Sequence, residues 1–225
     1  MRVSIMGDSI STYEGWNPEG YAVQYVSRYA RENGLASVSD TWWHRVLTAR
    51  GDELVVNDSF SGSLVSGGAF PSASCEERTR SVAGTGLAPD AVFFYIGVND
   101  YGYCAPLDRF GCDYALMLDR VAASCPGARL VCATLMKTHV AGYESWAFPP
   151  NQIGLDLDDY NDAIRDVVSS RATRGAMLAD LASGRETYET FDGVHPSAAG
   201  MATIADAWLH LLTGCPDLQF DEEER

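Results

Sequence analysis

The side chains that could do chemistry gather at a few short polar turns of this 225-residue sequence. A serine, Ser9, ends the apolar stretch at the start of the chain, and His195 follows Asp192 by three residues. A serine hydroxyl is a weak nucleophile unless a base accepts its proton, and an imidazole, with an ordinary pKa near ~6.5, can be that base. A carboxylate three residues before the histidine can reach the other ring nitrogen and fix its orientation. These three residues therefore predict acyl transfer through a serine.

The same chemistry needs hydrogen-bond donors for a developing oxyanion, and two further turns offer them. Gly62, within the stretch 61–63, has a backbone N–H that no side chain blocks, and Asn99, within 97–100, has an amide N–H₂. Together with the N–H of Ser9, these groups would form an oxyanion hole. Each residue alone has an ordinary interpretation, such as a helix cap, a turn former or a glycine with positive φ. Their joint occurrence and their order along the chain favour one site.

A parallel sheet could bring these turns together. Short apolar runs that are rich in β-branched and aromatic residues predict strands over 2–6, 53–57, 91–96, 129–134 and 176–179. Between them, capping residues and helical periodicity predict helices over 42–50, 113–124, 157–171 and 197–212. Alternating strands and helices imply a sheet with helices on both faces, and ligands bind beyond the carboxyl ends of its strands. We therefore expect one α/β/α domain over 1–216 and a flexible acidic tail over 217–225.

Composition limits the class of function. A formal charge of −15 argues against binding to nucleic acid or to anionic membranes, because phosphate neutralisation needs a basic patch. No apolar run approaches the ~18 residues that span a membrane, and the apolar start is too short for a secretory signal, so we expect a cytoplasmic protein. The six cysteines form no CxxC pair and are expected to be mostly reduced, although Cys104 and Cys112 could meet as a disulfide or weak metal pair.

In order along the chain, the polar turns resemble the sequence blocks of the SGNH hydrolases, also called the GDSL-like lipase/esterase superfamily. GDS at 7–9, SGS at 61–63, GVND at 97–100 and DGVHPS at 192–197 match four of its blocks, with Ile10 in place of the leucine of GDSL. The resemblance implies a flavodoxin-like three-layer α/β/α sandwich of about five parallel strands. It also implies ester hydrolysis through an acyl-serine, without metal or cofactor. Carried over by position, it assigns the triad Ser9, Asp192 and His195 and the oxyanion donors Ser9, Gly62 and Asn99.

Aromatic residues in the expected rim loops suggest the substrate. Rings with polar neighbours suit stacking on sugars, and they also suit a short acyl chain. We expect a small acyl ester, such as an acetyl ester, of a sugar or similar alcohol, with Asp8, Tyr101 and Trp146 as candidate substrate-binding residues. A lysophospholipase- or thioesterase-type acyl hydrolase is the alternative, followed by a non-catalytic ligand-binding domain. The oligomeric state, and whether 138–155 forms a lid, stay open.

Two further points follow from single residues. Adjacent residues on a helix point about 100° apart, so of Trp42 and Trp43 we expect only one to face the core and the other to lie at the rim or in an oligomer contact.

A phosphate or flavin site at the same rim, with Asp8 and Asp100 as ligands of Mg²⁺, is disfavoured. Lys137 is the only lysine, and the sequence has no glycine-rich phosphate loop.

Overall fold

The computed structural model describes residues 1–142, 149–184 and 186–214. Its main sheet consists of β1 (Arg2–Gly7), β2 (Glu53–Asn57), β3 (Ala91–Tyr95), β4 (Arg129–Ala133) and β6 (Ala176–Ala179). The strand order is β2-β1-β3-β4-β6, and every neighbouring pair is parallel. All five strands lie within a residue or two of their predicted bounds.

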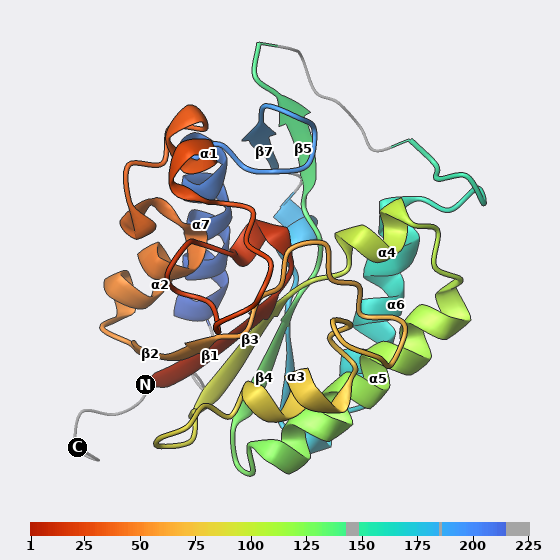
Figure 1. The fold of residues 1–225 in the computed structure, drawn as a ribbon. Coiled ribbons are helices and arrows are strands. Elements are labelled where there is room, and N and C mark those ends of the chain that lie inside the picture. Colours follow the sequence, from red (N-terminus) through yellow and green to blue (C-terminus); the bar gives the residue numbers. More distant parts are fainter. Residues whose placement is uncertain (143–148, 185, 215–225) are drawn as a thin grey trace.

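Helices cover both faces of this sheet, which confirms the predicted α/β/α layers (Figure 1). One face carries α1 (Ser27–Glu32), α2 (Trp42–Arg50) and α7 (Ala198–Thr213). The other carries α3 (Glu76–Ser81), α4 (Val98–Gly102), α5 (Leu107–Ser124) and α6 (Leu157–Ser169). The four longer helices were predicted, although α5 begins six residues earlier, directly after Pro106. The other three have five or six residues, too few to show a helical period.

The connections make a crevice between β1 and β3. From β1 the chain continues to β2 on one side and then returns to β3 on the other side of β1. At such a switch point the connecting segments leave in opposite directions, so the carboxyl ends of the two strands flank a gap. Ser9 follows β1 and Asn99 follows β3, and the topology therefore places both at this crevice.

A small second sheet was not predicted. It pairs β5 (Lys137–Val140) with β7 (Thr187–Thr190), beyond the carboxyl ends of the main strands (Figure 1). The Thr138 hydroxyl donates to the carbonyl of Gly193 at 2.8 Å, and Gly193 N–H donates to the Thr190 hydroxyl at 3.0 Å. Both strands thus hold the turn in which Asp192 and His195 lie.

Both tryptophans at the start of α2 are fully buried, so the expectation for this pair was wrong. Trp42 stacks on Trp208 of α7 with ring centroids 5.3 Å apart. Trp43 lies 5.8 Å from the ring of Trp16, which belongs to the loop between β1 and α1. That loop covers the side of α2 that helical periodicity alone leaves to solvent.

Three further predictions concern membrane spans, cysteine pairing and the C-terminal tail. Within the described ranges, no helix is long and apolar enough to cross a membrane. Cys104 and Cys112 both carry free thiols, so they form no disulfide with each other. The predicted acidic tail, 217–225, lies outside the described residues.

Candidate active site

Ser9, His195 and Asp192 form a chain of hydrogen bonds at the carboxyl end of β1. His195 Nε2 lies 3.0 Å from Ser9 Oγ, and His195 Nδ1 lies 2.7 Å from Asp192 Oδ2. With its proton on Nδ1 donated to the carboxylate, the imidazole presents Nε2 as an acceptor for the Ser9 hydroxyl. The fold therefore brings together three residues that the sequence separates by up to 186 positions.

The spacing of Asp192 and His195 closes a tight turn around one carboxylate. Asp192 Oδ1 accepts the backbone N–H groups of Val194 at 3.0 Å and of His195 at 2.8 Å. Burial raises the pKa of Asp192, but the hydrogen bonds from the imidazole and from these two N–H groups outweigh burial and hold it well below its ordinary value. The carboxylate therefore stays ionised and can stabilise a protonated His195.

The predicted oxyanion donors come from three separate turns. Asn99, in the first turn of α4, donates from Nδ2 to the carbonyl of Ser63 at 2.9 Å, which leaves its second amide hydrogen for another acceptor. Gly62 has φ +79°, a conformation that glycine adopts without strain. Among the described residues, no protein acceptor is recorded for the N–H of Ser9 or of Gly62. These donors can therefore bind an oxygen of a substrate.

A buried guanidinium joins the nucleophile turn to the loop that contains Gly62. Arg78 of α3 is fully buried and donates to Asp58 Oδ2 at 3.2 Å, to the Ser63 hydroxyl at 2.6 Å and to the Gly7 carbonyl at 3.1 Å. It also bonds the carbonyls of Asp58 and Pro71. Nothing in the sequence distinguishes Arg78, because it stands in the run EERTR, whose charged residues are typical of an exposed helix.

Close packing behind Ser9 explains the glycine that precedes it by two residues. A Cβ on Gly7 would lie 2.6 Å from Ser11 Oγ and 2.9 Å from Ser59 Oγ, closer than real Cβ atoms approach. Trp42 Nε1 donates to the same Ser11 hydroxyl at 3.1 Å, which ties the turn to the aromatic core. The nucleophile turn is therefore held from behind by buried contacts.

Two of the predicted substrate-binding residues, Asp8 and Tyr101, are buried. Asp8 is only 1% exposed, and its carboxylate accepts the N–H of Ile10 at 3.0 Å, so it caps the turn that holds Ser9. Tyr101 is 6% exposed, and its hydroxyl donates to the carbonyl of Pro149. Both side chains bond inside the protein, and their assignment to substrate binding stays a prediction. Trp146 lies outside the described residues.

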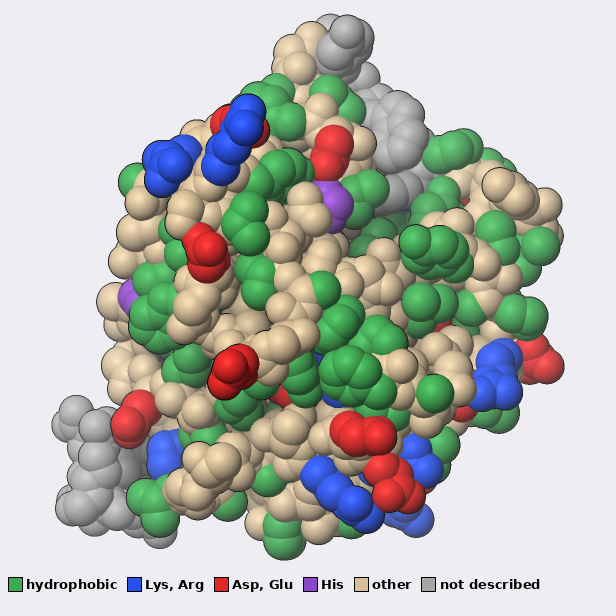
Figure 2. All heavy atoms as spheres, viewed as in Figure 1, with side chains coloured by type: hydrophobic (Ala, Val, Ile, Leu, Met, Phe, Trp, Pro, Cys, Tyr) green, Lys and Arg blue, Asp and Glu red, His purple; other side chains and the backbone are tan. Residues whose placement is uncertain are grey.

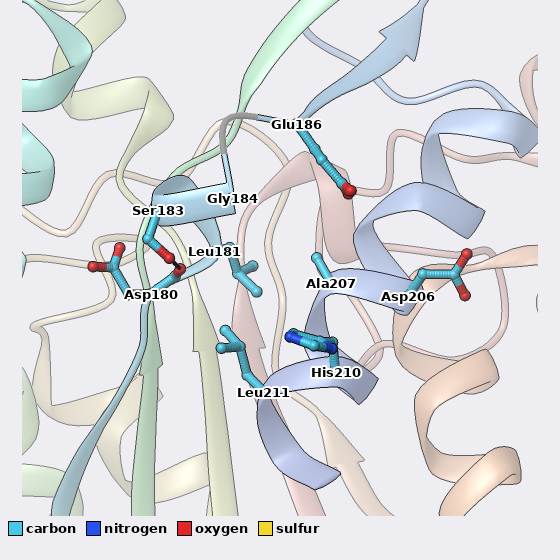
Figure 3. Close-up of a pocket in the computed structure, with 9 residues that line it drawn as sticks. All are labelled: Asp180, Leu181, Ser183, Gly184, Glu186, Asp206, Ala207, His210 and Leu211. Carbon is cyan, nitrogen blue, oxygen red and sulfur yellow. Dashed lines mark hydrogen bonds between the residues drawn. The ribbon is translucent and has the colours of Figure 1, made fainter. Parts of the chain in front are cut away.

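A cavity of about 470 Å³ lies apart from these groups, between the carboxyl end of β6 and α7 (Figure 3). No member of the Ser9–His195–Asp192 chain lines it in the described part of the molecule. In Figure 3, Asp206 points away from the cavity, whereas Glu186 and His210 approach it from opposite sides. Asp180 at its edge is ion-paired with Arg165. This cavity is therefore separate from the Ser9–His195–Asp192 chain, which remains the candidate site.

Over the ranges that the structure describes, no group of three or more His, Cys, Asp and Glu side chains is arranged to hold a metal ion.

The chain resembles known proteins in its sequence and in its fold. A family model described as GDSL-like lipase/acylhydrolase matches residues 1–212. A solved structure described as a GDSL-like lipase from Bacteroides ovatus has 22% identity and a TM-score of 0.70, over 95% of this chain and 98% of its own. Another from Bacteroides uniformis has 23% identity and a TM-score of 0.68, over 95% and 96%. An acetyl esterase with a serine replaced by alanine and an acetate ion has 18% identity and a TM-score of 0.60, over 95% and 96%. No curated protein matches the chain.

Proposed function

Because the chain belongs to the GDSL-like lipase/acylhydrolase family and is therefore a hydrolase of ester bonds, we propose that it removes a small acyl group, such as acetyl, from a sugar or similar alcohol. The observation that supports a serine mechanism is the hydrogen-bonded chain Ser9–His195–Asp192 beside the donors of Gly62 and Asn99.

In the proposed mechanism, Ser9 Oγ attacks the ester carbonyl while its proton passes to His195 Nε2. The carbonyl oxygen becomes negative and is held by the N–H groups of Ser9 and Gly62 and by the Asn99 amide. The intermediate collapses to an acyl-serine, and His195 returns the proton to the departing alcohol. A water molecule, deprotonated by His195, then attacks the acyl-serine; the bond to Ser9 Oγ breaks, His195 returns the proton to that oxygen, and the acid is released.

Burial and charge support a small, neutral substrate. Ser9 is only 3% exposed, which supports a short acyl group, because a bulky acyl group needs more room around the serine hydroxyl. The chain carries a net charge of −15, which disfavours anionic substrates. On the face shown in Figure 2, Lys and Arg lie mostly toward the margin, with hydrophobic and neutral polar groups in the middle.

An aromatic cluster supports the sugar as the alcohol. The rings of Tyr21, Phe60 and Phe70 pack with centroids 5.3 to 5.7 Å apart. Phe60 lies two residues before Gly62, and its N–H donates to the carbonyl of Gly7, so the cluster adjoins the oxyanion loop. Phe70 is 47% exposed and offers a ring face on which a sugar can stack.

The serine mechanism is tested with a fluorophosphonate probe, which labels an activated serine. Wild-type protein should become labelled at Ser9, and Ser9→Ala should lose both labelling and ester hydrolysis, by roughly 10⁴-fold or more in kcat. Ser11→Ala is the matched control, because Ser11 lies in the same turn but bonds only within the core. Retention of a tenth of wild-type hydrolysis by Ser9→Ala would contradict the proposal.

The substrate is tested separately with a panel of p-nitrophenyl esters of increasing chain length, acetylated monosaccharides, an acyl-CoA and a lysophospholipid. We expect the highest kcat/KM on acetyl esters, and Phe70→Ala should raise KM for the acetylated sugars only. Leu87→Ala is the control, because Leu87 is 73% exposed and precedes β3, at the opposite end of the sheet. A preference for the acyl-CoA would indicate a thioesterase instead of a sugar esterase, and a preference for the lysophospholipid would indicate a lysophospholipase.

A further inference from the structure

A tyrosine from a distant element touches the carboxylate of the proposed triad. Tyr29, on α1, donates its hydroxyl to Asp192 Oδ2 at 3.0 Å. This is the same oxygen that accepts the proton of His195 Nδ1 at 2.7 Å. We propose that Tyr29 is a positioning residue that acts on the reaction through Asp192; the inference rests on the proposed serine esterase function.

The other bonds to this carboxylate cannot do what Tyr29 does. Asp192 accepts from His195 Nδ1, from the N–H of His195, from the N–H of Val194 and from Tyr29, which fills the roughly four acceptor sites of a carboxylate. The first three donors belong to the same turn as Asp192 and move with it. Among the described residues, Tyr29 alone ties the carboxylate to another element of the fold.

The tyrosine ring also restrains the imidazole. The ring centroids of Tyr29 and His195 are 6.2 Å apart, with the ring planes at 87°, an edge-to-face contact. Tyr29 also packs against Tyr25, with ring centroids 5.7 Å apart. A rotation of His195 away from Ser9 would therefore have to displace a ring that is itself packed.

The phenol keeps its proton over the range in which an esterase works. Burial raises the pKa of Tyr29 to about 12, and the charge of Asp192 acts in the same direction. Tyr29 is therefore a permanent neutral donor. Its hydrogen bond withdraws charge from Oδ2, the oxygen that stabilises a protonated His195, and at the same time it fixes the plane of the carboxylate.

Removing the hydroxyl should then have two effects. Without the tether, the carboxylate and the imidazole spend less time aligned, so Tyr29→Phe should lower kcat roughly tenfold, the size of one lost hydrogen bond to a charged group. Without the neutral donor, Asp192 attracts a protonated imidazole more strongly, and a protonated imidazole cannot accept the Ser9 proton. The acidic limb of the pH–rate profile should therefore move to higher pH.

The experiment follows the rate at which a fluorophosphonate labels Ser9 between about pH 4.5 and 9, because this rate does not depend on knowing the natural ester. Tyr25→Phe is the matched control. It removes a hydroxyl from the same segment, and that hydroxyl donates to the carbonyl of Pro196 at 2.8 Å rather than to Asp192. We expect Tyr29→Phe to react more slowly with a shifted acidic limb, and Tyr25→Phe to show no shift. Thermal melting checks that both variants fold.

A double-mutant cycle identifies the path of the effect. If Tyr29 acts through Asp192, then Tyr29→Phe should change the rate little when Asp192→Asn is already present. Equal labelling rates and equal pH profiles for Tyr29→Phe and wild type would overturn the inference. It would also be overturned if Tyr29→Phe lost only as much labelling rate as Tyr25→Phe and its acidic limb did not shift. Absence of labelling in the wild-type protein would instead overturn the serine mechanism, and the role of Tyr29 with it.

Discussion

The amide of Asn99 is anchored to the carbonyl oxygen of Ser63, 2.9 Å away, so the side chain that follows β3 is fixed to the loop that follows β2. The neighbouring Asp100 strengthens this junction, because its carboxylate accepts the N–H groups of Val65 at 2.8 Å and of Ser66 at 3.0 Å. The hydrogen bond from one N–H of the Asn99 amide to Ser63 therefore fixes the direction of the second N–H of the same amide. The donors of the proposed oxyanion hole are thus positioned before substrate binds.

Asn99→Ala should lower kcat by roughly 10²–10³ and change KM little, because an oxyanion donor acts mainly on charge that develops in the transition state. The measurement is steady-state hydrolysis of p-nitrophenyl acetate, with thermal melting to show that the Ser63 loop is still folded. A rise in KM with an unchanged kcat would show that Asn99 binds the ground state of the substrate instead.

Arg78→Met should destabilise the protein by roughly 3–5 kcal/mol, because it leaves the carboxylate of Asp58 buried without its partner. Both side chains of this ion pair are fully buried. Urea unfolding measures the loss, and Arg80→Met is the control on the same helix. Arg80 is 74% exposed and pairs with Glu76, so its replacement should cost no more than about 0.5 kcal/mol. Equal losses in the two variants would contradict the role given to Arg78.

Asp8→Asn should flatten the pH dependence of stability. Burial raises the pKa of Asp8 from its ordinary value of 3.8 to about 7, although the Ile10 N–H and the charges of His195 and Arg78 oppose the rise and Asp100 adds to it. The folded protein therefore binds this proton more tightly than the unfolded chain. The resulting stabilisation is complete below the ordinary value and is lost as the pH rises toward 7.

Wild-type stability should accordingly fall relative to Asp8→Asn by on the order of 2 kcal/mol between about pH 4.5 and 7. The asparagine can still accept the Ile10 N–H through its amide oxygen, so the turn itself is kept. Denaturant unfolding at several pH values gives the difference directly. A difference that stays constant across this range would show that Asp8 has the same proton affinity in both states.

Saturating EDTA should leave ester hydrolysis unchanged. The proposed mechanism assigns activation of the serine and of water to His195, and stabilisation of the oxyanion to N–H donors, so no step is given to a metal ion. The check is the hydrolysis rate after prolonged incubation with chelator, followed by addition of Zn²⁺ or Mg²⁺. Loss of activity with EDTA and recovery with one cation would indicate a metal-bound hydroxide instead.

The sequence was sufficient to predict what depends on local pattern. The five main strands are short runs with apolar centres, and the four longer helices have a capping residue or an apolar stripe, so both could be located from the sequence. The strands β5 and β7 could not, because KTHV and TYET are mostly polar and pair only with each other across 50 positions of the chain. Trp43 was misjudged because its burial comes from the loop around Trp16, a contact that no helical pattern contains.

The residues of the candidate site also divide into those that a local sequence pattern reveals and those that it does not. Ser9, Gly62, Asn99 and the Asp192–His195 pair could be proposed because they occupy recognisable turns at predicted strand ends. Tyr29 and Arg78 could not, since their roles depend on the direction of a side chain across the fold. Asp8 and Tyr101 stand next to site turns in sequence and are buried, a property that sequence proximity alone does not reveal.

The long separation of Ser9 from His195 has a consequence for biosynthesis. At ~5–20 residues per second, a ribosome adds the intervening 186 residues in roughly 10 to 40 seconds. During that time the nucleophile turn exists without its base, and the segment that brings His195 to it also includes β7 and the start of α7. A nascent chain that ends before residue 195 therefore lacks the proposed base, and acquisition of a fluorophosphonate-reactive serine would mark the point at which the two ends of the domain have met.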